Sequence, residues 1–381
     1  MSVTSTLSPL SRLSKLGQSV WIDYLSRDLI ESGELMRLVR EDAVVGVTSN
    51  PSIFAEALSH TEAYDTQLIE IPEHETNLKE IFYMLAARDV AAACELLYPV
   101  WQATRGLDGY VSWEIDPHFA DDREASVEEA DRLHAWIDRP NLLIKIPATG
   151  AGVSAIEESI ARGTSINVTL IFSLDRYREV VEAYLSGLER LAADGGDLAQ
   201  VHSVASFFIS RVDTEADRRL SQIGRGNELR GKLGLANAKL AYQTFVSAFS
   251  GPRWERLAGK GATKQRCLWA STSTKNPAYP DVMYVEGLIG PETVNTMTRE
   301  TVRAFQDHGQ VAETLGHGVG DAYGIFDEFD RVGVSYEETV ATLEREGVAK
   351  FIASFEGLLQ GIGMKHDALT GSKISGAEPR P

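Results

Sequence analysis

Cysteine is scarce in this sequence, which has two cysteines, Cys94 and Cys267, among 381 residues. They show neither CxxC spacing nor a nearby pair of histidines, which argues against a disulfide framework and a zinc site. HxH and HExxH spacings are missing as well, and so are the GxGxxG, GxxxxGKS and GxxxxGKT loops that cradle nucleotide phosphates. We therefore expect no metal and no cofactor, and we expect both cysteines to be buried and inert.

Long apolar runs are missing too. No stretch approaches the roughly 18 uninterrupted apolar residues that a membrane-spanning helix needs. The segment Met1–Gln18 lacks the cationic start and apolar run of a secretion signal. We therefore expect a cytoplasmic protein with no membrane partner.

Basic residues are outnumbered, with 37 Lys+Arg against 55 Asp+Glu and a net charge of −18. A field of this sign repels nucleic acid and anionic lipid, so we expect no nucleic-acid partner. If the ligand carries a phosphate, its site must concentrate Arg, Lys and backbone N–H groups against this field. The charge therefore sets a requirement that the motifs have to meet.

With 43% apolar and 24% charged residues, the chain has the composition of a globular protein. Short apolar or β-branched runs alternate with longer segments of helical periodicity. The eight runs are Ser19–Asp23, Ala43–Thr48, Gly109–Glu114, Leu142–Pro147, Ser165–Phe172, Val201–Ser206, Gln265–Ser271 and Val282–Val285. The helical segments include Asn77–Gln102, Val127–Asp138, Leu174–Ala193 and Leu235–Phe249. This alternation predicts the α/β class and a closed (β/α)8 TIM barrel with extra helices and a C-terminal helical extension.

We predict one domain over residues 1–381: a barrel core at about 19–300, a C-terminal helical region at 301–360 and a mobile tail at 361–381. A final amphipathic helix is expected over Tyr336–Leu359. The Gly-rich segment Ile223–Gly234 is predicted to be a loop within the domain. The sequence leaves open whether this loop forms a subunit contact or covers a site, and it leaves monomer and homodimer open.

A lysine stands in the middle of an aliphatic strand, Leu-Leu-Ile-Lys145-Ile-Pro. Lysine is seldom buried without a purpose. Burial disfavours the ammonium form, and the neutral amine is the nucleophile that condenses with a ketone. Lys145 is therefore a candidate for a Schiff base, although the pattern fits a structural lysine paired with one carboxylate equally well.

Polar side chains also gather toward the C-terminal ends of other predicted strands, where barrel enzymes build their sites. Period-two alternation places Ser112, Glu114 and Asp116 on one face of the third strand. The further candidates are Asp23 after strand one, Thr48 and Asn50 after strand two, and Asn167 and Thr169 on strand five. Any one of them alone fits a cap or turn residue, but together they indicate a site.

Hydroxyl and cationic residues follow strands six and seven, where barrels often bind phosphate. They are Ser206 and Arg211 after strand six, and Ser271, Ser273 and Lys275 after strand seven. This cluster meets the requirement set by the net charge. Taken alone, Arg211 fits a surface salt bridge with Asp213.

These blocks together resemble the transaldolase family in its long bacterial form. The matching blocks are Gly46-Val-Thr-Ser-Asn50-Pro-Ser-Ile-Phe54, Leu143-Ile-Lys145-Ile-Pro147, Asn167-Val-Thr169-Leu-Ile-Phe-Ser173, Ser206 to Arg211, Tyr284 and Leu288 to Met297. The resemblance implies transfer of a dihydroxyacetone unit from sedoheptulose 7-phosphate to glyceraldehyde 3-phosphate, giving erythrose 4-phosphate and fructose 6-phosphate. That reaction belongs to the non-oxidative pentose phosphate pathway, and its partners are sugar phosphates.

The resemblance also implies roles. Lys145 would form the imine, Asp23 would exchange the proton of the hydroxyl at the broken bond, and Glu114 would move protons through a water held with Thr169. Asn50 would bind sugar hydroxyls. The other substrate- and phosphate-binding residues would be Ser206, Arg211, Ser271, Lys275 and Thr48. One departure from the family pattern is Lys275, which stands where many members have arginine and supplies a point charge instead of a bidentate fork.

Three alternatives remain at this stage. The related fructose 6-phosphate aldolases usually have Gln in place of Glu114 and Tyr in place of Phe208, so these two residues favour transfer over plain cleavage. A barrel hydrolase could use Glu114 and Asp116, with Lys145 only neutralising charge. A noncatalytic sugar-phosphate binder would keep Arg211 and Lys275 and would not need Lys145.

Overall fold

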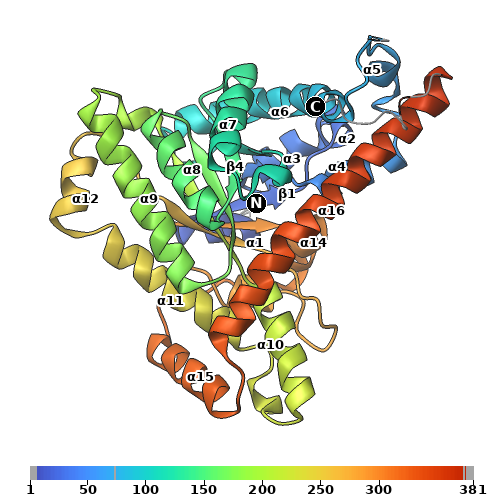
Figure 1. Cartoon of the computed structure of the whole chain (residues 1–381). Helices are drawn as coiled ribbons and strands as arrows, with labels where there is room; N and C mark the ends of the chain where they lie inside the picture. Colours follow the sequence, from blue (N-terminus) through green and yellow to red (C-terminus); the bar gives the residue numbers. More distant parts are fainter. Residues whose placement is uncertain (1–6, 73, 372–373, 375–381) are drawn as a thin grey trace, which may run out of the picture.

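The computed structural model describes residues 7–72, 74–371 and 374, and its centre is a barrel of eight parallel strands (Figure 1). The strands are β1 Gln18–Asp23, β2 Val44–Thr48, β3 Tyr110–Glu114, β4 Leu142–Pro147, β5 Ile166–Ile171, β6 Ser203–Phe208, β7 Arg266–Ala270 and β8 Thr293–Met297. They follow one another around the barrel in sequence order, and β8 pairs with β1 to close it. The predicted TIM barrel is confirmed.

The helices and short 3₁₀ turns surround this barrel. They are α1 Pro9–Lys15, α2 Arg27–Glu31, α3 Glu34–Glu41, α4 Pro51–His60, α5 Asp65–Ile69, α6 Leu78–Ala103, η1 Pro117–Phe119, α7 Arg123–Ile137, α8 Gly150–Ala161, α9 Leu174–Ala193, η2 Leu198–Gln200, α10 Ser210–Ile223, η3 Asn227–Leu229, α11 Leu233–Ala248, α12 Gly251–Ala258, α13 Met283–Glu286, α14 Arg299–His308, α15 Val319–Arg331 and α16 Tyr336–Thr370. The four predicted helical segments correspond to α6, α7, α9 and α11.

One strand prediction is wrong. The segment Val282–Val285 forms the helical turn α13, and the eighth strand is Thr293–Met297. Polar residues hid this strand, since it reads Thr-Val-Asn-Thr-Met. All five residues are buried, and polar atoms among them have partners inside the barrel; Gln18 Nε2 donates to Thr293 Oγ1 at 3.1 Å, and the Thr272 hydroxyl donates to Asn295 Oδ1 at 3.0 Å. Strand six is also shifted, to Ser203–Phe208 from the predicted Val201–Ser206.

Helices that follow the strands start at side-chain caps, which fixes the direction in which the chain leaves each strand. Asn50, Thr149 and Ser173 cap α4, α8 and α9 by accepting from the backbone N–H three residues later. Gly152 lies against the end of β4, where an added Cβ would come within 1.9 Å of the Pro147 carbonyl oxygen. Glycine at this position therefore allows α8 to start directly beside the strand that carries Lys145.

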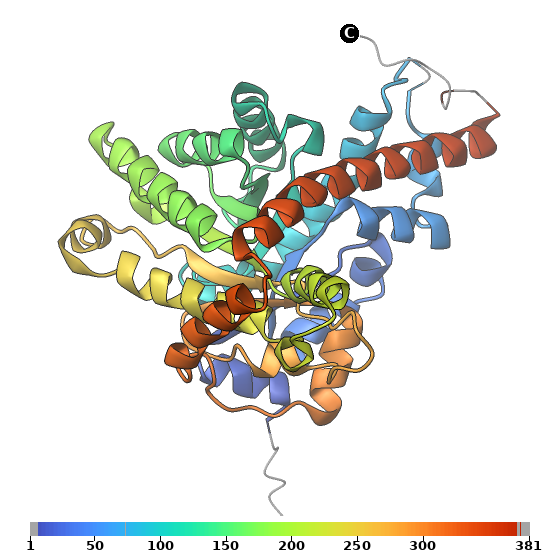
Figure 2. The ribbon, with the colours of Figure 1, turned by 60° about the horizontal axis from the view of Figure 1, so that its bottom comes forward.

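The C-terminal helix α16 crosses the barrel at the C-terminal ends of the strands and packs against α4, α6 and β5 (Figure 2). Helices α14, α15 and α16 lie where the C-terminal helical region at 301–360 was expected, with α14 beginning at Arg299. The predicted tail is wrong for residues 361–370, which continue α16 as helix. Its glycines lower intrinsic helix propensity, but tertiary packing overrides that preference; Gly347 lies directly over Phe172 and Leu170. The rest of the predicted tail lies outside the described residues, apart from 371 and 374.

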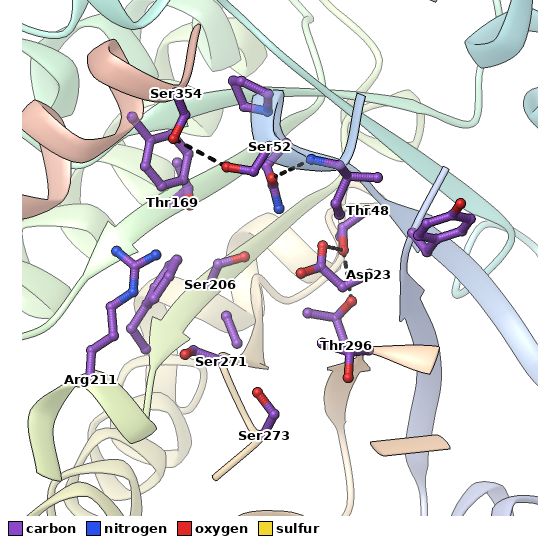
Figure 3. Close-up of a pocket in the computed structure, with 18 of the residues that line it drawn as sticks. Asp23, Thr48, Ser52, Thr169, Ser206, Arg211, Ser271, Ser273, Thr296 and Ser354 are labelled. Carbon is purple, nitrogen blue, oxygen red and sulfur yellow. Dashed lines mark hydrogen bonds between the residues drawn. The ribbon is translucent and has the colours of Figure 1, made fainter. Parts of the chain in front are cut away.

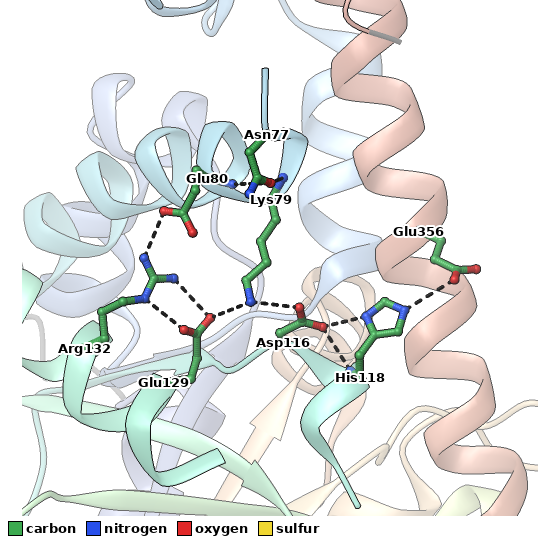
Figure 4. A network of polar contacts seen from close by, with 8 residues as sticks. All are labelled: Asn77, Lys79, Glu80, Asp116, His118, Glu129, Arg132 and Glu356. Atoms are coloured by element: carbon green, nitrogen blue, oxygen red, sulfur yellow. Dashed lines mark hydrogen bonds and ion pairs between the residues drawn. The ribbon is translucent and has the colours of Figure 1, made fainter. Parts of the chain in front are cut away.

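A network of charged side chains ties α6, α7 and η1 to α16 (Figure 4). Lys79 Nζ lies 3.0 Å from Asp116 Oδ2 and 3.4 Å from Glu129 Oε1. His118 contacts Asp116 Oδ1 through Nδ1 at 2.7 Å and Glu356 Oε1 on α16 through Nε2 at 3.3 Å. Burial opposes protonation of His118, but its hydrogen bonds to Asp116 and Glu356 outweigh this and raise its pKa. The network therefore helps to fix α16 over the barrel.

Nowhere in the described ranges does a helix combine the length and apolar character that crossing a membrane requires.

Candidate active site

A cavity of about 600 Å³ opens at the C-terminal ends of the strands (Figure 3). Of the ten residues to which the family resemblance assigns roles, all except Glu114 line it: Asp23, Thr48, Asn50, Lys145, Thr169, Ser206, Arg211, Ser271 and Lys275. Glu114 lies behind Lys145 and contacts it. The barrel thus brings all the predicted residues together, although they are separated by up to 252 positions in the sequence, from Asp23 to Lys275.

Lys145 reaches the cavity from β4 and is 5% exposed. Its strand neighbours Ile144 and Ile146 are fully buried in the hydrophobic core. The Lys145 Nζ atom donates to the Ser49 carbonyl oxygen at 3.3 Å and lies 3.6 Å from Glu114 Oε1. The amine is therefore held at the cavity wall beside one carboxylate, and that carboxylate is too far away for a hydrogen bond.

Glu114, on the neighbouring strand β3, pairs with Lys145 in the sheet register. Burial raises the pKa of Glu114 to about 7, nearby Lys145 lowers it, and Asp23 raises it further. Both Glu114 carboxylate oxygens and Thr169 Oγ1 are buried and make no hydrogen bond to any described residue. This carboxyl group can therefore gain or lose a proton near neutral pH, as proton transfer requires.

A strained backbone accompanies Thr169. The next residue, Leu170, has φ 58°, a left-handed conformation that leucine rarely adopts, and the β5–β6 register shifts between Val168 and Ile171. Irregularities of this kind re-aim side chains at barrel rims. Such strain persists only where the surrounding packing holds it in place, and Leu170 is buried in the hydrophobic cluster under α16.

Asp23 belongs to a chain of hydroxyl groups (Figure 3). The Thr48 hydroxyl donates to Asp23 Oδ1 at 2.7 Å and lies 2.7 Å from Thr296 Oγ1. A hydroxyl has one proton, and Thr48 gives that proton to the carboxylate, so Thr296 must be the donor to Thr48. Thr48 therefore orients Asp23, and toward any ligand it can only accept.

Ser206 is similarly engaged. Its hydroxyl donates to Asn167 Oδ1 at 2.7 Å, and Asn167 Nδ2 donates to Ser112 Oγ at 2.9 Å. A phosphate ligand accepts hydrogen bonds, so Ser206 would have to turn away from Asn167 to bind one. These contacts favour Ser206 as support for the inner layer of the barrel over a phosphate ligand.

Arg211 and Lys275 form the cationic side of the cavity. The Arg211 guanidinium lies 5.0 Å from the centre of the Phe208 ring, and its buried Nη1 makes no hydrogen bond to the described part of the chain. Burial lowers the pKa of Arg211 while Asp23 and Glu114 raise it. Partial desolvation, and then Arg211, lower the pKa of Lys275, whose Nζ donates to Ser273 Oγ at 2.9 Å. Because Arg211 acts electrostatically on Lys275, an anion bound between the two side chains would offset their repulsion.

Ser271 joins the two loops of this cationic side. It has φ 56°, and its Oγ lies 2.9 Å from Ser210 Oγ at the start of α10. The Ser210 N–H also donates to the Ser271 carbonyl oxygen at 3.1 Å. The alternative interpretation of Arg211, a surface salt bridge with Asp213, is not supported, because the buried Asp213 carboxylate accepts from Gly234 and Tyr284 instead.

The family model described as "Transaldolase/Fructose-6-phosphate aldolase" matches residues 20–362. The chain belongs to this family. Transaldolase 1 of Streptomyces avermitilis is 50% identical over 365 residues, covering 95% of this chain and 97% of the relative. A transaldolase of Renibacterium salmoninarum is 47% identical over 371 residues, covering 97% and 98%. A transaldolase of Thermobifida fusca is 49% identical over 366 residues, covering 95% and 100%. The resemblance to transaldolases drawn from the sequence is confirmed.

The cavity of this transaldolase/fructose-6-phosphate aldolase family member is also lined by residues that the sequence analysis missed. Thr296 was missed because the eighth strand was placed too early. Arg299 and Arg303 on α14, and Lys350, Phe351 and Ser354 on α16, also line the cavity. A correct eighth strand would have revealed Thr296, whereas no local pattern shows that α16 returns to the barrel mouth.

The hydrolase alternative finds no support in the geometry. Asp116 is turned away from the cavity and contacts Lys79 and His118. Asp116 therefore cannot act with Glu114 as the alternative requires, and Glu114 faces Lys145 instead.

Proposed function

We propose that the chain catalyses the transaldolase reaction through a Schiff base on Lys145. The reaction moves a dihydroxyacetone unit from sedoheptulose 7-phosphate to glyceraldehyde 3-phosphate and yields erythrose 4-phosphate and fructose 6-phosphate. The observation that carries the proposal is the environment of Lys145. It is the buried lysine of the described chain, lies 3.6 Å from a carboxyl group with a raised pKa, and shares its cavity with cationic side chains that include Arg211 and Lys275.

Imine formation uses Lys145 and Glu114. The neutral amine adds to the ketone carbon, and the resulting carbinolamine loses its hydroxyl as water. Glu114 takes the proton that the amine gives up and returns a proton to the departing hydroxyl, by way of a water shared with Thr169. A carboxyl group whose pKa is about 7 suits both directions of transfer.

Carbon–carbon cleavage uses Asp23. The protonated imine withdraws electrons from the C3–C4 bond, while Asp23 takes the proton of the C4 hydroxyl, so the aldose phosphate leaves as an aldehyde. The three-carbon unit stays on Lys145 as an enamine and adds to the incoming aldehyde, to which Asp23 gives its proton back. The hydrogen bond from Thr48 aims the Asp23 carboxylate for this step.

The substrate is held at both ends. Arg211 and Lys275 bind the phosphate, with Ser271 between their loops, and Asn50 binds sugar hydroxyls. The Asn50 side chain caps α4 with its Oδ1 atom, which leaves the amide N–H donors for the sugar. Sugar phosphates are therefore the proposed ligands, and the proposed setting is the non-oxidative pentose phosphate pathway of the cytoplasm.

Borohydride trapping tests the Schiff base. Reduction in the presence of fructose 6-phosphate should attach the three-carbon unit to Lys145, as peptide mass spectrometry would show, and should abolish activity. Lys145→Met should neither label nor turn over. Lys275→Met is the matched control, since it removes an amine from the same cavity but should still label at Lys145. Full activity after trapping, or in Lys145→Met, would refute the proposal.

A second assay separates transfer from plain aldol cleavage, the other activity in the family description. Fructose 6-phosphate is supplied with and without erythrose 4-phosphate. Sustained turnover that requires the acceptor supports transfer, which Glu114 and Phe208 favour. Turnover at the same rate without the acceptor would identify an aldolase.

A further inference from the structure

Two carboxylates on α10, Asp213 and Asp217, are buried one helical turn apart, beside the cationic side of the cavity. Asp213 Oδ1 accepts from the Gly234 N–H at 2.7 Å, and Oδ2 accepts from the Tyr284 hydroxyl at 2.8 Å. Asp217 Oδ1 accepts from the Gly231 N–H at 3.2 Å, and Oδ2 accepts from the Tyr279 hydroxyl. Each carboxylate thus receives one backbone N–H and one tyrosine hydroxyl.

The four donors come from two segments. Gly231 and Gly234 lie at the end of the 223–234 loop, and Tyr279 and Tyr284 lie in the segment after β7. The segments also touch directly, because an added Cβ at Gly231 would lie 2.9 Å from Tyr279 Cζ. Gly234 packs just as tightly against the residue before α10, because an added Cβ there would lie 2.9 Å from the Ile209 carbonyl oxygen. Glycine is therefore needed for both N–H groups to approach α10.

Arg211 and Lys275, the two cations that follow β6 and β7, both lie on segments that carry this cluster. Arg211 is in the first turn of α10, two residues before Asp213, and Lys275 is four residues before Tyr279. Ser210 and Ser271 already connect the start of α10 with the start of the Lys275 segment. The Asp217–Tyr279 hydrogen bond connects them a second time, beyond Lys275. The Lys275 segment is thus fixed to α10 on both sides of the lysine.

We propose that Asp213 and Asp217, with Tyr284 and Tyr279, are positioning residues that hold Arg211 and Lys275 at the spacing required for one substrate phosphate. This inference rests on the proposed function. Arg211 and Lys275 repel each other when no phosphate is bound, and a lysine offers a point charge on a flexible stem without the fixed fork of arginine. Fixing the backbone on both sides of Lys275 offsets this disadvantage, because preorganised groups bind with less loss of entropy.

The 223–234 loop gains a role from this inference. It supplies two N–H groups to buried carboxylates, which would otherwise be left without enough donors. A buried carboxylate lacking donors is costly, so the loop and α10 hold each other in place. The loop therefore supports the phosphate site through α10, and none of its residues lines the cavity.

The test uses Tyr279→Phe and Tyr284→Phe in the full chain, because each removes one hydroxyl and keeps the ring. Tyr184→Phe is the matched control; its hydroxyl donates to the Thr263 carbonyl oxygen at 2.7 Å, at the amino-terminal side of the barrel. Two quantities are measured: the Kd of inorganic phosphate by calorimetry, and kcat and KM with phosphorylated and phosphate-free substrates. Fructose and glyceraldehyde are the phosphate-free pair.

Each Tyr→Phe change at positions 279 and 284 should raise the Kd of phosphate and the KM for sugar phosphates by about tenfold, the usual effect of losing a hydrogen bond to a charged group. Turnover at saturation should stay within about twofold, and the phosphate-free reaction and the Tyr184→Phe control should not change. Asp217→Asn, a second route to the same defect, should raise the same Kd.

An unchanged phosphate Kd in both tyrosine variants would overturn the inference, and so would equal losses with phosphorylated and phosphate-free substrates. A thermal unfolding curve identifies any variant that is simply unfolded, and the other tyrosine variant then decides. Failure of the proposed function would appear differently, as a wild-type chain that binds phosphate and is not labelled at Lys145 by borohydride.

Discussion

The hydroxyl chain behind Asp23 gives a prediction that the structure makes quantitative. Thr48→Val keeps the shape of the side chain and removes the proton donated to Asp23. Thr296→Val removes only the donor to Thr48. Both residues are buried, and valine is close to threonine in volume, so the packing changes little. The two variants therefore remove successive hydrogen bonds from one chain.

The expected magnitudes follow from the partners. A hydrogen bond to a charged group contributes about 1.5–3 kcal/mol, and one between neutral groups about 0.5–1.5 kcal/mol. If the whole effect falls on the step that Asp23 serves, Thr48→Val should slow cleavage by about 10- to 150-fold and Thr296→Val by about 2- to 12-fold. Because Thr296 acts through Thr48, the double variant should be no slower than Thr48→Val alone.

Two measurements separate the steps. Dihydroxyacetone forms an imine without any carbon–carbon cleavage, so borohydride trapping of dihydroxyacetone should proceed normally in both variants. Release of erythrose 4-phosphate in a single turnover with sedoheptulose 7-phosphate should be slowed. The control is Thr272→Val, which removes a buried hydroxyl that donates to Asn295 Oδ1 at 3.0 Å and lies 3.3 Å from the Thr296 carbonyl oxygen, but removes none of the hydroxyl groups that lead to Asp23. It should change neither measurement by more than about twofold.

Slower trapping of dihydroxyacetone would refute this assignment, because Thr48 would then act on Lys145 and not on Asp23. Multiplied losses in the double variant would show that Thr296 acts independently of Thr48. Equal rate losses in Thr48→Val and Thr272→Val would show that both losses come from changed packing or stability and not from the orientation of Asp23.

Three further predictions concern protonation and stability. Imine formation needs a neutral Lys145 amine, so Lys145 and Glu114 together must hold only one proton. We therefore expect kcat/KM to rise with pH through about 7, the raised pKa of Glu114. The Glu114→Gln variant should lose this rise in the pH profile. Arg27 and Asp89 form a buried ion pair at 2.9 Å, so Asp89→Ala should lower the free energy of unfolding by about 3–5 kcal/mol in urea titrations, because it leaves the guanidinium without its partner. The pKa of His118 is raised in the folded state, so its stabilising contribution is present below the unfolded value of about 6.5 and is lost as pH rises through the folded value; hydrogen-exchange protection of α16 near Glu356 should fall over that range.

Each of these has a contrary outcome. If kcat/KM of Glu114→Gln still rises with pH through about 7, the rise comes from the titration of a group other than Glu114. An Arg27→Met and Asp89→Leu double variant should unfold less readily than Asp89→Ala alone, and equal losses would show that an unpaired charge is not the cause. His118→Gln should remove the pH dependence of protection in α16, and an unchanged dependence would exclude His118 as its source.

Local pattern determined much of this protein. Short apolar or β-branched runs between segments of helical periodicity predicted the barrel, because each element must bury its apolar surface and the repeat leaves few ways to do so. Lys145 was conspicuous for the same reason, since a charge inside an aliphatic strand conflicts with its surroundings. The residues at the strand ends followed from the barrel, because parallel strands bring their C-terminal ends to one face.

Only the tertiary structure decided the remainder. The eighth strand was misplaced because its polar residues contact partners distant in the sequence, such as Gln18 on the adjacent strand β1, that no local window contains. Helix α16 and its cavity residues depend on contacts between segments hundreds of positions apart. The roles of hydroxyl groups were also undecided, since Thr48 and Ser206 have identifiable donor directions only once Asp23 and Asn167 are placed beside them. Periodicity records which face of an element is buried, and the partner that meets that face is fixed only by the fold.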